Sequence, residues 1–283
     1  DLNRITRVHA GEKLSVDVYT SHFSWKKFKN PVLHWSLTGI GALGEYLPRM
    51  ACGAGEIRFE PFCVEKQQNL EFEVPQGIRG AYLFLWVQDG EAKVCQNYAQ
   101  LIVDDGECAP RGAVCELPPL SYTELKCDRE HGCFFRGRTS LLWMAGAGSV
   151  SYLWKPDKSA RTARLVFEAG SRQGIGAVKV TDEIRFPSQL EICVGGIRVA
   201  SLELADDPSD ERALFTNAAL GGEPFNYANL GKYGYGEKFE IDIPPELMQA
   251  DAVEITFRCG SGGMTLYGEY AGRYGFHPSI IWE

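Results

Sequence analysis

The sequence lacks the short motifs that mark the common hydrolytic and zinc-dependent sites. Its 283 residues contain no G-x-S-x-G, no H-E-x-x-H and no C-x-x-C. These spacings are typical of α/β-hydrolases, zinc proteases and structural zinc sites. The five histidines are scattered and form no metal-ligand spacing. The absences predict a chain that is not an enzyme on its own.

Long apolar runs and a basic surplus are missing as well. No apolar run approaches the ~20 residues that span a bilayer, and no leader with a basic and an apolar part opens the chain. The formal net charge is −8, which disfavours a phosphate-binding surface. We therefore predict neither a membrane nor a nucleic acid as a partner.

One glycine-rich motif that is present is weak evidence for a cofactor site. Residues 39–44 match G-x-G-x-x-G, which binds dinucleotides only where a helix opens at the motif. Pro48 and further glycines follow instead. The sequence therefore predicts a glycine-rich turn here.

The nine cysteines do not fix a redox state. The pairs Cys108 with Cys115 and Cys127 with Cys133 could form short disulfides, since each lies in a loop-rich section. Cys193 lies in a strand-like run and is expected to pack in the core, as is Cys259. An odd count leaves at least one free thiol.

Short strands dominate the first hundred residues. Residues 12–20, 32–37 and 69–74 alternate apolar and polar side chains, as half-buried strands do. Residues 81–88 read as a buried strand that ends in a turn at Asp89 and Gly90. Six or seven such strands in about ninety residues predict an immunoglobulin-like β-sandwich over residues 1–105.

The second half also reads as strands. Residues 106–138 are rich in proline, glycine and charge and are predicted to be a linker or strap. Strand-like runs resume at residue 139, with a hairpin turn at Gly195 and Gly196. Eight to ten strands with long loops predict a β-jelly-roll over residues 139–283. The expected fold class is all-β.

Aromatic and polar residues gather in the loops expected for the second domain, mainly in residues 164–187 and 262–278. Sugars stack their C–H faces on aromatic rings while their hydroxyls pair with charged and amide groups. The alternative is that these aromatic residues pack in the core or in turns. The predicted ligand-binding residues are Arg172, Asp182, Glu183, Tyr233, Tyr235, Tyr267, Glu269, Arg273 and Tyr274.

An acidic cluster is the one candidate metal site. Asp206, Asp207 and Asp210 offer the hard oxygen ligands that Ca²⁺ prefers. A turn or a helix cap is the alternative. No other cofactor is expected.

Parts of both halves resemble a known family. The run DVYTSHFSWKKFKNPVLHWSL, with the later NYAQLIV, resembles the immunoglobulin-like domains that follow the catalytic barrel in family 2 glycoside hydrolases. The second half is similar to the galactose-binding-like jelly rolls of such bacterial enzymes. That similarity is carried by LVFEAGS, TDEIRFPSQLEI, LADDPSDERA, GKYGYG and GGMTLYGEYAGRYGFHP.

The resemblance implies a C-terminal accessory region of such an enzyme. The family's catalytic glutamates lie on a barrel domain, and no barrel is predicted here, so no catalytic residue is carried over. The jelly roll is then expected to be a carbohydrate-binding module, in some cases with a structural Ca²⁺.

We therefore predict a non-catalytic region that binds a plant or algal polysaccharide or oligosaccharide beside a covalently linked catalytic domain. The alternatives are two structural sandwiches that support or oligomerise a barrel, and an independent hydrolase. The compartment is not fixed; secretion or a periplasmic location is slightly favoured.

Overall fold

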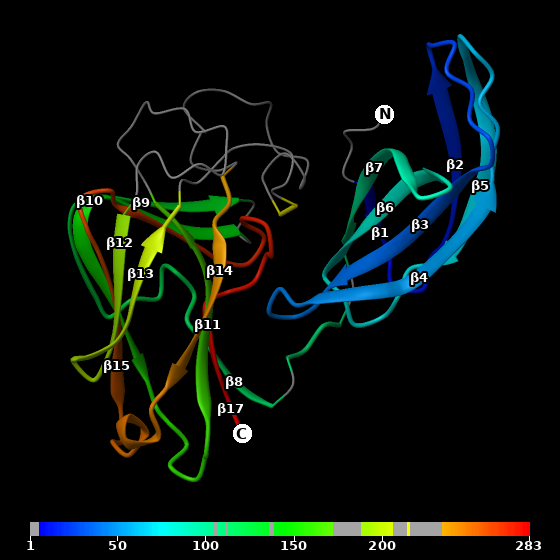
Figure 1. The fold of residues 1–283 in the computed structure, drawn as a ribbon. Helices are drawn as coiled ribbons and strands as arrows, with labels where there is room; N and C mark the ends of the chain where they lie inside the picture. Colours follow the sequence, from blue (N-terminus) through cyan, green and yellow to red (C-terminus); the bar gives the residue numbers. More distant parts are fainter. Residues whose placement is uncertain are drawn as a thin grey trace. The chain divides into compact units, whose positions relative to one another are not determined.

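The computed structural model describes residues 6–104, 107–110, 112–135, 139–171, 188–205, 214–215 and 234–283. The chain divides into two compact units, residues 1–109 and 110–283, each of which is followed separately in Figure 1. Within the described ranges every regular element is a β-strand, apart from one 3-10 turn, η2 (Pro245–Met248). No helix among them is long and apolar enough to cross a membrane. The predicted all-β fold built of β-sandwich domains is confirmed.

The first unit contains two sheets over its described residues, 6–104 and 107–109. Five strands pair in the order β1-β7-β6-β3-β4, and the other two form the separate antiparallel pair β2-β5. The strands are β1 (Thr6–Val8), β2 (Lys13–His22), β3 (Pro31–Ile40), β4 (Tyr46–Glu56), β5 (Cys63–Glu73), β6 (Gly80–Asp89) and β7 (Ala92–Val103).

Alternating apolar residues hold these two sheets together. Leu37 and Leu83 on the five-stranded sheet are 0% and 2% exposed. They share one core with Phe72 of β5 and with Val74, which directly follows β5. The ring of Trp35 lies 5.6 Å from that of Phe72. Because side chains on a strand alternate between its faces, the other face of the five-stranded sheet points away from this core.

The predicted turns are confirmed. Asp89 pairs with Ala92 across a two-residue connection in which Gly90 has a φ of 62°. Gly195 and Gly196 both have positive φ values, which is the requirement of a type I′ hairpin turn. The glycine motif at residues 39–44 ends β3 and turns into β4, without a helix.

In the described residues of the second unit, ten strands form one continuous hydrogen-bonded network. Its main path runs β13-β12-β15-β10-β16-β11-β17-β8, while β14 pairs with β11 and β9 pairs with β10. The strands are β8 (Ala113–Glu116), β9 (Glu124–Phe135), β10 (Thr139–Trp154), β11 (Ala163–Gly170), β12 (Ser188–Val194), β13 (Ile197–Leu204), β14 (Glu237–Ile243), β15 (Val253–Cys259), β16 (Met264–Tyr267) and β17 (Ser279–Trp282).

The long strand β10 connects the two layers of this sandwich. Its first half pairs with β16 and its second half with β15, with a register shift in its β9 pairing between Ala145 and Gly148. Phe167 of β11 and Phe257 of β15 meet edge-to-face at 5.1 Å, and both are fully buried. Such pairs add to the free energy gained by burying the rings.

The prediction of a linker over residues 106–138 is wrong for much of that segment. β8 pairs with β17 and β9 pairs with β10, so both strands belong to the second sandwich. Proline, glycine and charged residues in the segment obscure these strands. The partner of β8 also lies far away in sequence, since Glu116 pairs with Ser279.

The disulfide that the sequence left possible between Cys108 and Cys115 is not formed, since both cysteines are free. The Cys108 thiol donates to the carbonyl of Gly77 at 3.0 Å. The side chain of Cys133 lies outside the described residues, so the possible pair of Cys127 with Cys133 is not tested. Cys193 and Cys259 are 5% and 3% exposed, as predicted for core residues.

Candidate functional site

Several predicted site residues lie outside the described part of the chain. These are Arg172, Asp182, Glu183 and Tyr233 of the ligand set and Asp206, Asp207 and Asp210 of the possible Ca²⁺ site. Within the described residues, no group of three or more His, Cys, Asp or Glu side chains is placed to hold a metal ion.

Tyr235, Arg273 and Tyr274 come together around one buried carboxylate that the sequence reading did not single out. Glu168 of β11 is 1% exposed. One of its oxygens accepts the backbone N–H groups of Gly236 at 2.9 Å and Arg273 at 2.8 Å, and the other accepts that of Tyr274 at 3.1 Å. The guanidinium of Arg273 lies 4.2 Å from the ring of Tyr235. Glu168 therefore links the loop after β16 to Gly236, the residue that directly precedes β14.

Tyr267 and Glu269 lie on either side of the point where this loop begins. Tyr267 pairs with Glu168 across β16 and β11. The backbone N–H of Glu269 donates to Nδ1 of His277 at 3.1 Å, which holds the two ends of the loop together.

Burial gives the tyrosines of this region a packing role. Tyr235, Tyr267 and Tyr274 are 2%, 1% and 7% exposed. A ring buried to this degree presents no face on which a sugar could stack. We therefore do not carry the sugar-stacking interpretation of these three residues forward.

Glu168 makes the stability of the second unit dependent on pH. Burial raises its pKa from 4.5 to about 7, against the opposing effect of the N–H groups of Arg273, Gly236 and Tyr274. A raised carboxyl pKa means that folding favours the protonated form. Its contribution is complete below about pH 4.5 and is lost as the pH rises through about 7.

We expect urea denaturation to show the unfolding free energy falling by on the order of 3 kcal/mol between these pH values through this group. The Glu168→Gln variant should remove that part of the pH dependence. An unchanged slope in the variant would assign the dependence to other groups.

An exposed aromatic surface occurs in the first unit, on the side of the five-stranded sheet that faces away from its core. We call this surface the aromatic face. Three rows of cross-strand neighbours run over β3, β6 and β7, and each row contains a ring from β6. The rows are His34–Trp86–Gln96, Ser36–Phe84–Tyr98 and Thr38–Tyr82–Gln100.

The rings of the aromatic face contact one another. Tyr82 stacks with Phe84 at 5.8 Å, and both rings lie beside Tyr98 at 6.2 and 6.3 Å. His34 and Trp86 stack at 5.3 Å with an interplanar angle of 11°. Ring contacts of this kind hold each side chain in one orientation, so the surface is formed before any ligand arrives.

The aromatic face also contains a shallow depression of about 290 Å³. Phe84 is 40% exposed there, and the polar side chains around it come from β7. The residues that line the depression are Phe84, Leu85, Trp86, Lys93, Gln96, Asn97 and Tyr98. Apolar rings beside a cation and an amide form, on this face, the combination that the sequence predicted for the second unit.

Sequence reasoning missed this surface because β6 was interpreted as a strand buried on both faces. A period-two signal was available, since Tyr82, Phe84 and Trp86 alternate with Leu83, Leu85 and Val87. Only the second set faces the core. Three aromatic residues at every second position could have indicated a separate face.

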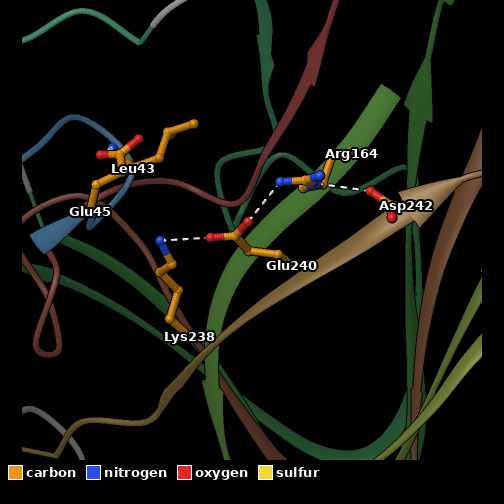
Figure 2. A network of polar contacts seen from close by, with 6 residues as sticks. All are labelled: Leu43, Glu45, Arg164, Lys238, Glu240 and Asp242. Carbon is orange, nitrogen blue, oxygen red and sulfur yellow. Dashed lines mark hydrogen bonds and ion pairs between the residues drawn. The ribbon is translucent and has the colours of Figure 1, made fainter. Parts of the chain in front are cut away.

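A polar network covers the outer face of β11 and β14 in the second unit. Figure 2 shows Arg164 between two carboxylates, 2.8 Å from Asp242 and 3.0 Å from Glu240. Lys238 lies 2.9 Å from the other oxygen of Glu240, and the pKa of Glu240 is lowered by Lys238 and then by Arg164. Exposed ion pairs of this kind add little to the free energy of unfolding. The Arg164 guanidinium already donates to the carboxylates of Asp242 and Glu240 on the neighbouring strand.

Comparisons with known proteins place the chain in no sequence family. No family model matches it, and no curated protein sequence matches it significantly. Solved structures show distant similarity. One is BtGH115A, a family GH115 4-O-methyl-α-glucuronidase with specificity for decorated arabinogalactans, at a TM-score of 0.32 and 8% identity over 66% of this chain.

Two further structures are similar at the same distant level. A carbohydrate-binding module of the β-sandwich superfamily has a TM-score of 0.27 and 7% identity, over 95% of either chain. A mutant of Bacteroides uniformis β-glucuronidase 2 has a TM-score of 0.24 and 13% identity over 99% of this chain. The chain spans 20% of the length of BtGH115A and 28% of that of the β-glucuronidase. Similarity at this level transfers no activity to this chain.

Proposed function

We propose that this chain is a non-catalytic carbohydrate-binding region and that the aromatic face of its first unit holds the sugar. The observation that carries the proposal is the arrangement of Phe84, Trp86 and Tyr98 on two adjacent strands, on the side away from the core. Phe84 is exposed and Trp86 and Tyr98 are half-buried, while the buried ring of Tyr82 packs beside them. Distant likeness to carbohydrate-binding modules is compatible with it.

The chemistry of the aromatic face suits a sugar ring. The C–H faces of a pyranose are apolar and stack on aromatic rings, while its hydroxyls need donors and acceptors at the rim. Gln96 supplies an amide group beside the rings, and Lys93, which donates to the Gln96 amide oxygen, supplies a cation. A sheet surface continues along its strands, which favours an extended polysaccharide over a single sugar; a plant or algal polymer is the expected source.

No catalytic role is proposed for the buried carboxylate. Glu168 has the raised pKa that general acids often have, but it is 1% exposed and is occupied by three backbone N–H groups. The purified chain is expected to turn over no aryl glycoside. Turnover that is abolished by one carboxylate substitution would contradict this part of the proposal.

Affinity electrophoresis against a panel of soluble polysaccharides, with and without Ca²⁺, tests sugar binding. We expect retardation by one class of polymer. Phe84→Ala and Tyr98→Ala should each weaken it about fivefold, because losing one stacked ring costs roughly 1 kcal/mol. Tyr122→Ala is the matched control, since Tyr122 is 37% exposed and lies in the other unit.

Two results would overturn the proposed site. If Tyr122→Ala weakens retardation as much as Tyr98→Ala, the aromatic face is not the binding surface. If no polymer retards the chain, sugar binding itself fails. The alternative of structural sandwiches that support or oligomerise a catalytic barrel then becomes the better proposal.

A further inference from the structure

A second group of exposed aromatic side chains lies at one end of the two-stranded sheet in the first unit. His22 at the end of β2 pairs with Cys63 at the start of β5. Residues 23–30 and 57–62 therefore meet at the same end, which is at the top of the first unit in Figure 1. We call the surface formed by Phe23, Trp25 and Phe62, with the lysines beside them, the aromatic tip.

A hydrogen bond and several ring contacts hold the base of the aromatic tip in place. His22 is 8% exposed, and its Nε2 atom lies 2.9 Å from the carbonyl oxygen of Lys26. The rings of Phe28 and Phe59 pack against His22 and against each other, at centroid distances of 4.8 to 5.5 Å. Asp89 accepts the backbone N–H groups of the two residues that end the loop.

The outer part of the aromatic tip is exposed to an unusual degree. Trp25 is 78%, Phe23 67% and Phe62 51% exposed. Large aromatic residues seldom lie so far outside the protein unless they contact something else. The loop already has two aromatic residues for its own packing, so folding does not require these three.

The backbone of Phe62 gives independent support. Its φ of 58° lies in the left-handed region, which a bulky residue rarely adopts and which glycine would adopt without strain. In this conformation the Phe62 ring lies 4.8 Å from the exposed ring of Trp25. Strain that serves an exposed contact is typical of a functional surface.

Charge indicates what the aromatic tip contacts. Residues 21–30 and 57–64 contain four cationic residues and one acidic residue, although the chain as a whole carries a net charge of −8. Lys26, Lys27 and Lys29 are all exposed beside Trp25. A second copy of this loop would therefore be repelled, and an anionic surface would be attracted.

We propose that the aromatic tip docks on the anionic surface of a lipid bilayer, with Trp25, Phe23 and Phe62 inserted at the headgroup level. Tryptophan is enriched at that level of membranes, and neighbouring lysines add attraction to anionic lipids. The rings of Trp25 and Phe62 meet at 72°, so they form no flat platform for a sugar. The sequence alone predicted no membrane partner, and docking of the aromatic tip on a bilayer does not depend on sugar binding by the aromatic face.

Co-sedimentation of the full chain with phosphatidylcholine vesicles, with and without phosphatidylserine, tests the proposal. We expect binding only where phosphatidylserine is present, and its loss at high salt. Trp25→Ala and the charge reversal Lys26→Glu with Lys27→Glu should each reduce partitioning about tenfold. Leu153→Ala is the control, because Leu153 is 53% exposed in the other unit.

Phe62→Gly separates binding from folding. Glycine removes both the ring and the strain, so the melting temperature should stay equal or rise while vesicle binding falls. Three results would overturn the proposal: no binding to phosphatidylserine vesicles, equal binding by Trp25→Ala, or Trp25-dependent self-association without vesicle binding, which would make the tip an interface between copies of this chain.

Discussion

Replacing Glu168 with alanine is expected to lower the unfolding free energy of the second unit by about 3–5 kcal/mol. The substitution leaves the backbone N–H groups of Gly236, Arg273 and Tyr274 without the acceptor that they share in the folded chain. Each buried donor left without a partner costs roughly 1–3 kcal/mol, and the missing side chain also leaves a cavity.

The measurement is urea denaturation of the full chain, with hydrogen exchange to follow β11 and the loop after β16. The loss should be larger at pH 5 than at pH 8, since the native carboxyl is most favourable when protonated. Glu168→Gln keeps the volume and one acceptor oxygen, so it should cost less than half as much. Equal losses in both variants would show that the carboxyl does not organise the loop.

Gly272→Ala is expected to have a comparably large effect for a steric reason. Gly272 has a φ of 69°, and a Cβ atom built there would lie 2.3 Å from a carboxylate oxygen of Glu168. The three hydrogen bonds that hold Glu168 prevent it from moving aside. Strain and displacement together should cost about 2–4 kcal/mol.

Gly196→Ala is the matched control for this substitution. Its φ of 81° is equally unfavourable for alanine, but nothing lies within 4 Å of the added carbon. It should therefore cost only about 1–2 kcal/mol from backbone strain. If both substitutions cost the same in thermal unfolding, Glu168 is not fixed as tightly as its hydrogen bonds indicate.

The two units differ in how far the sequence could predict their candidate sites. In residues 262–278 the sequence predicted tyrosines that stack on a sugar, but Tyr267 and Tyr274 are buried, because composition does not distinguish an exposed ring from a buried one. The buried acceptor at the centre, Glu168, lies in an apolar strand and stands 105 residues from Arg273. No local pattern connects residues so far apart.

For the aromatic face, in contrast, the sequence does contain a local pattern. The alternation of Tyr82, Phe84 and Trp86 with leucine and valine is visible in the sequence, but a strand of apolar residues reads as buried on both faces. Only the pairing of β6 with β7 places Tyr98 beside these rings. Only the packing of the β2-β5 pair against the five-stranded sheet decides which side of that sheet faces the core.

The sequence by itself determined most of the strands outside residues 106–138, the hairpin turns and the all-β class. Alternation of side chains and the positive φ of glycines act over a few residues, so they can be read locally. The tertiary structure decided the role of each aromatic residue. The same side chain type lies in the core at Tyr267, on a sheet face at Tyr98 and in solvent at Tyr19, because burial depends on partners that only the folded chain brings together.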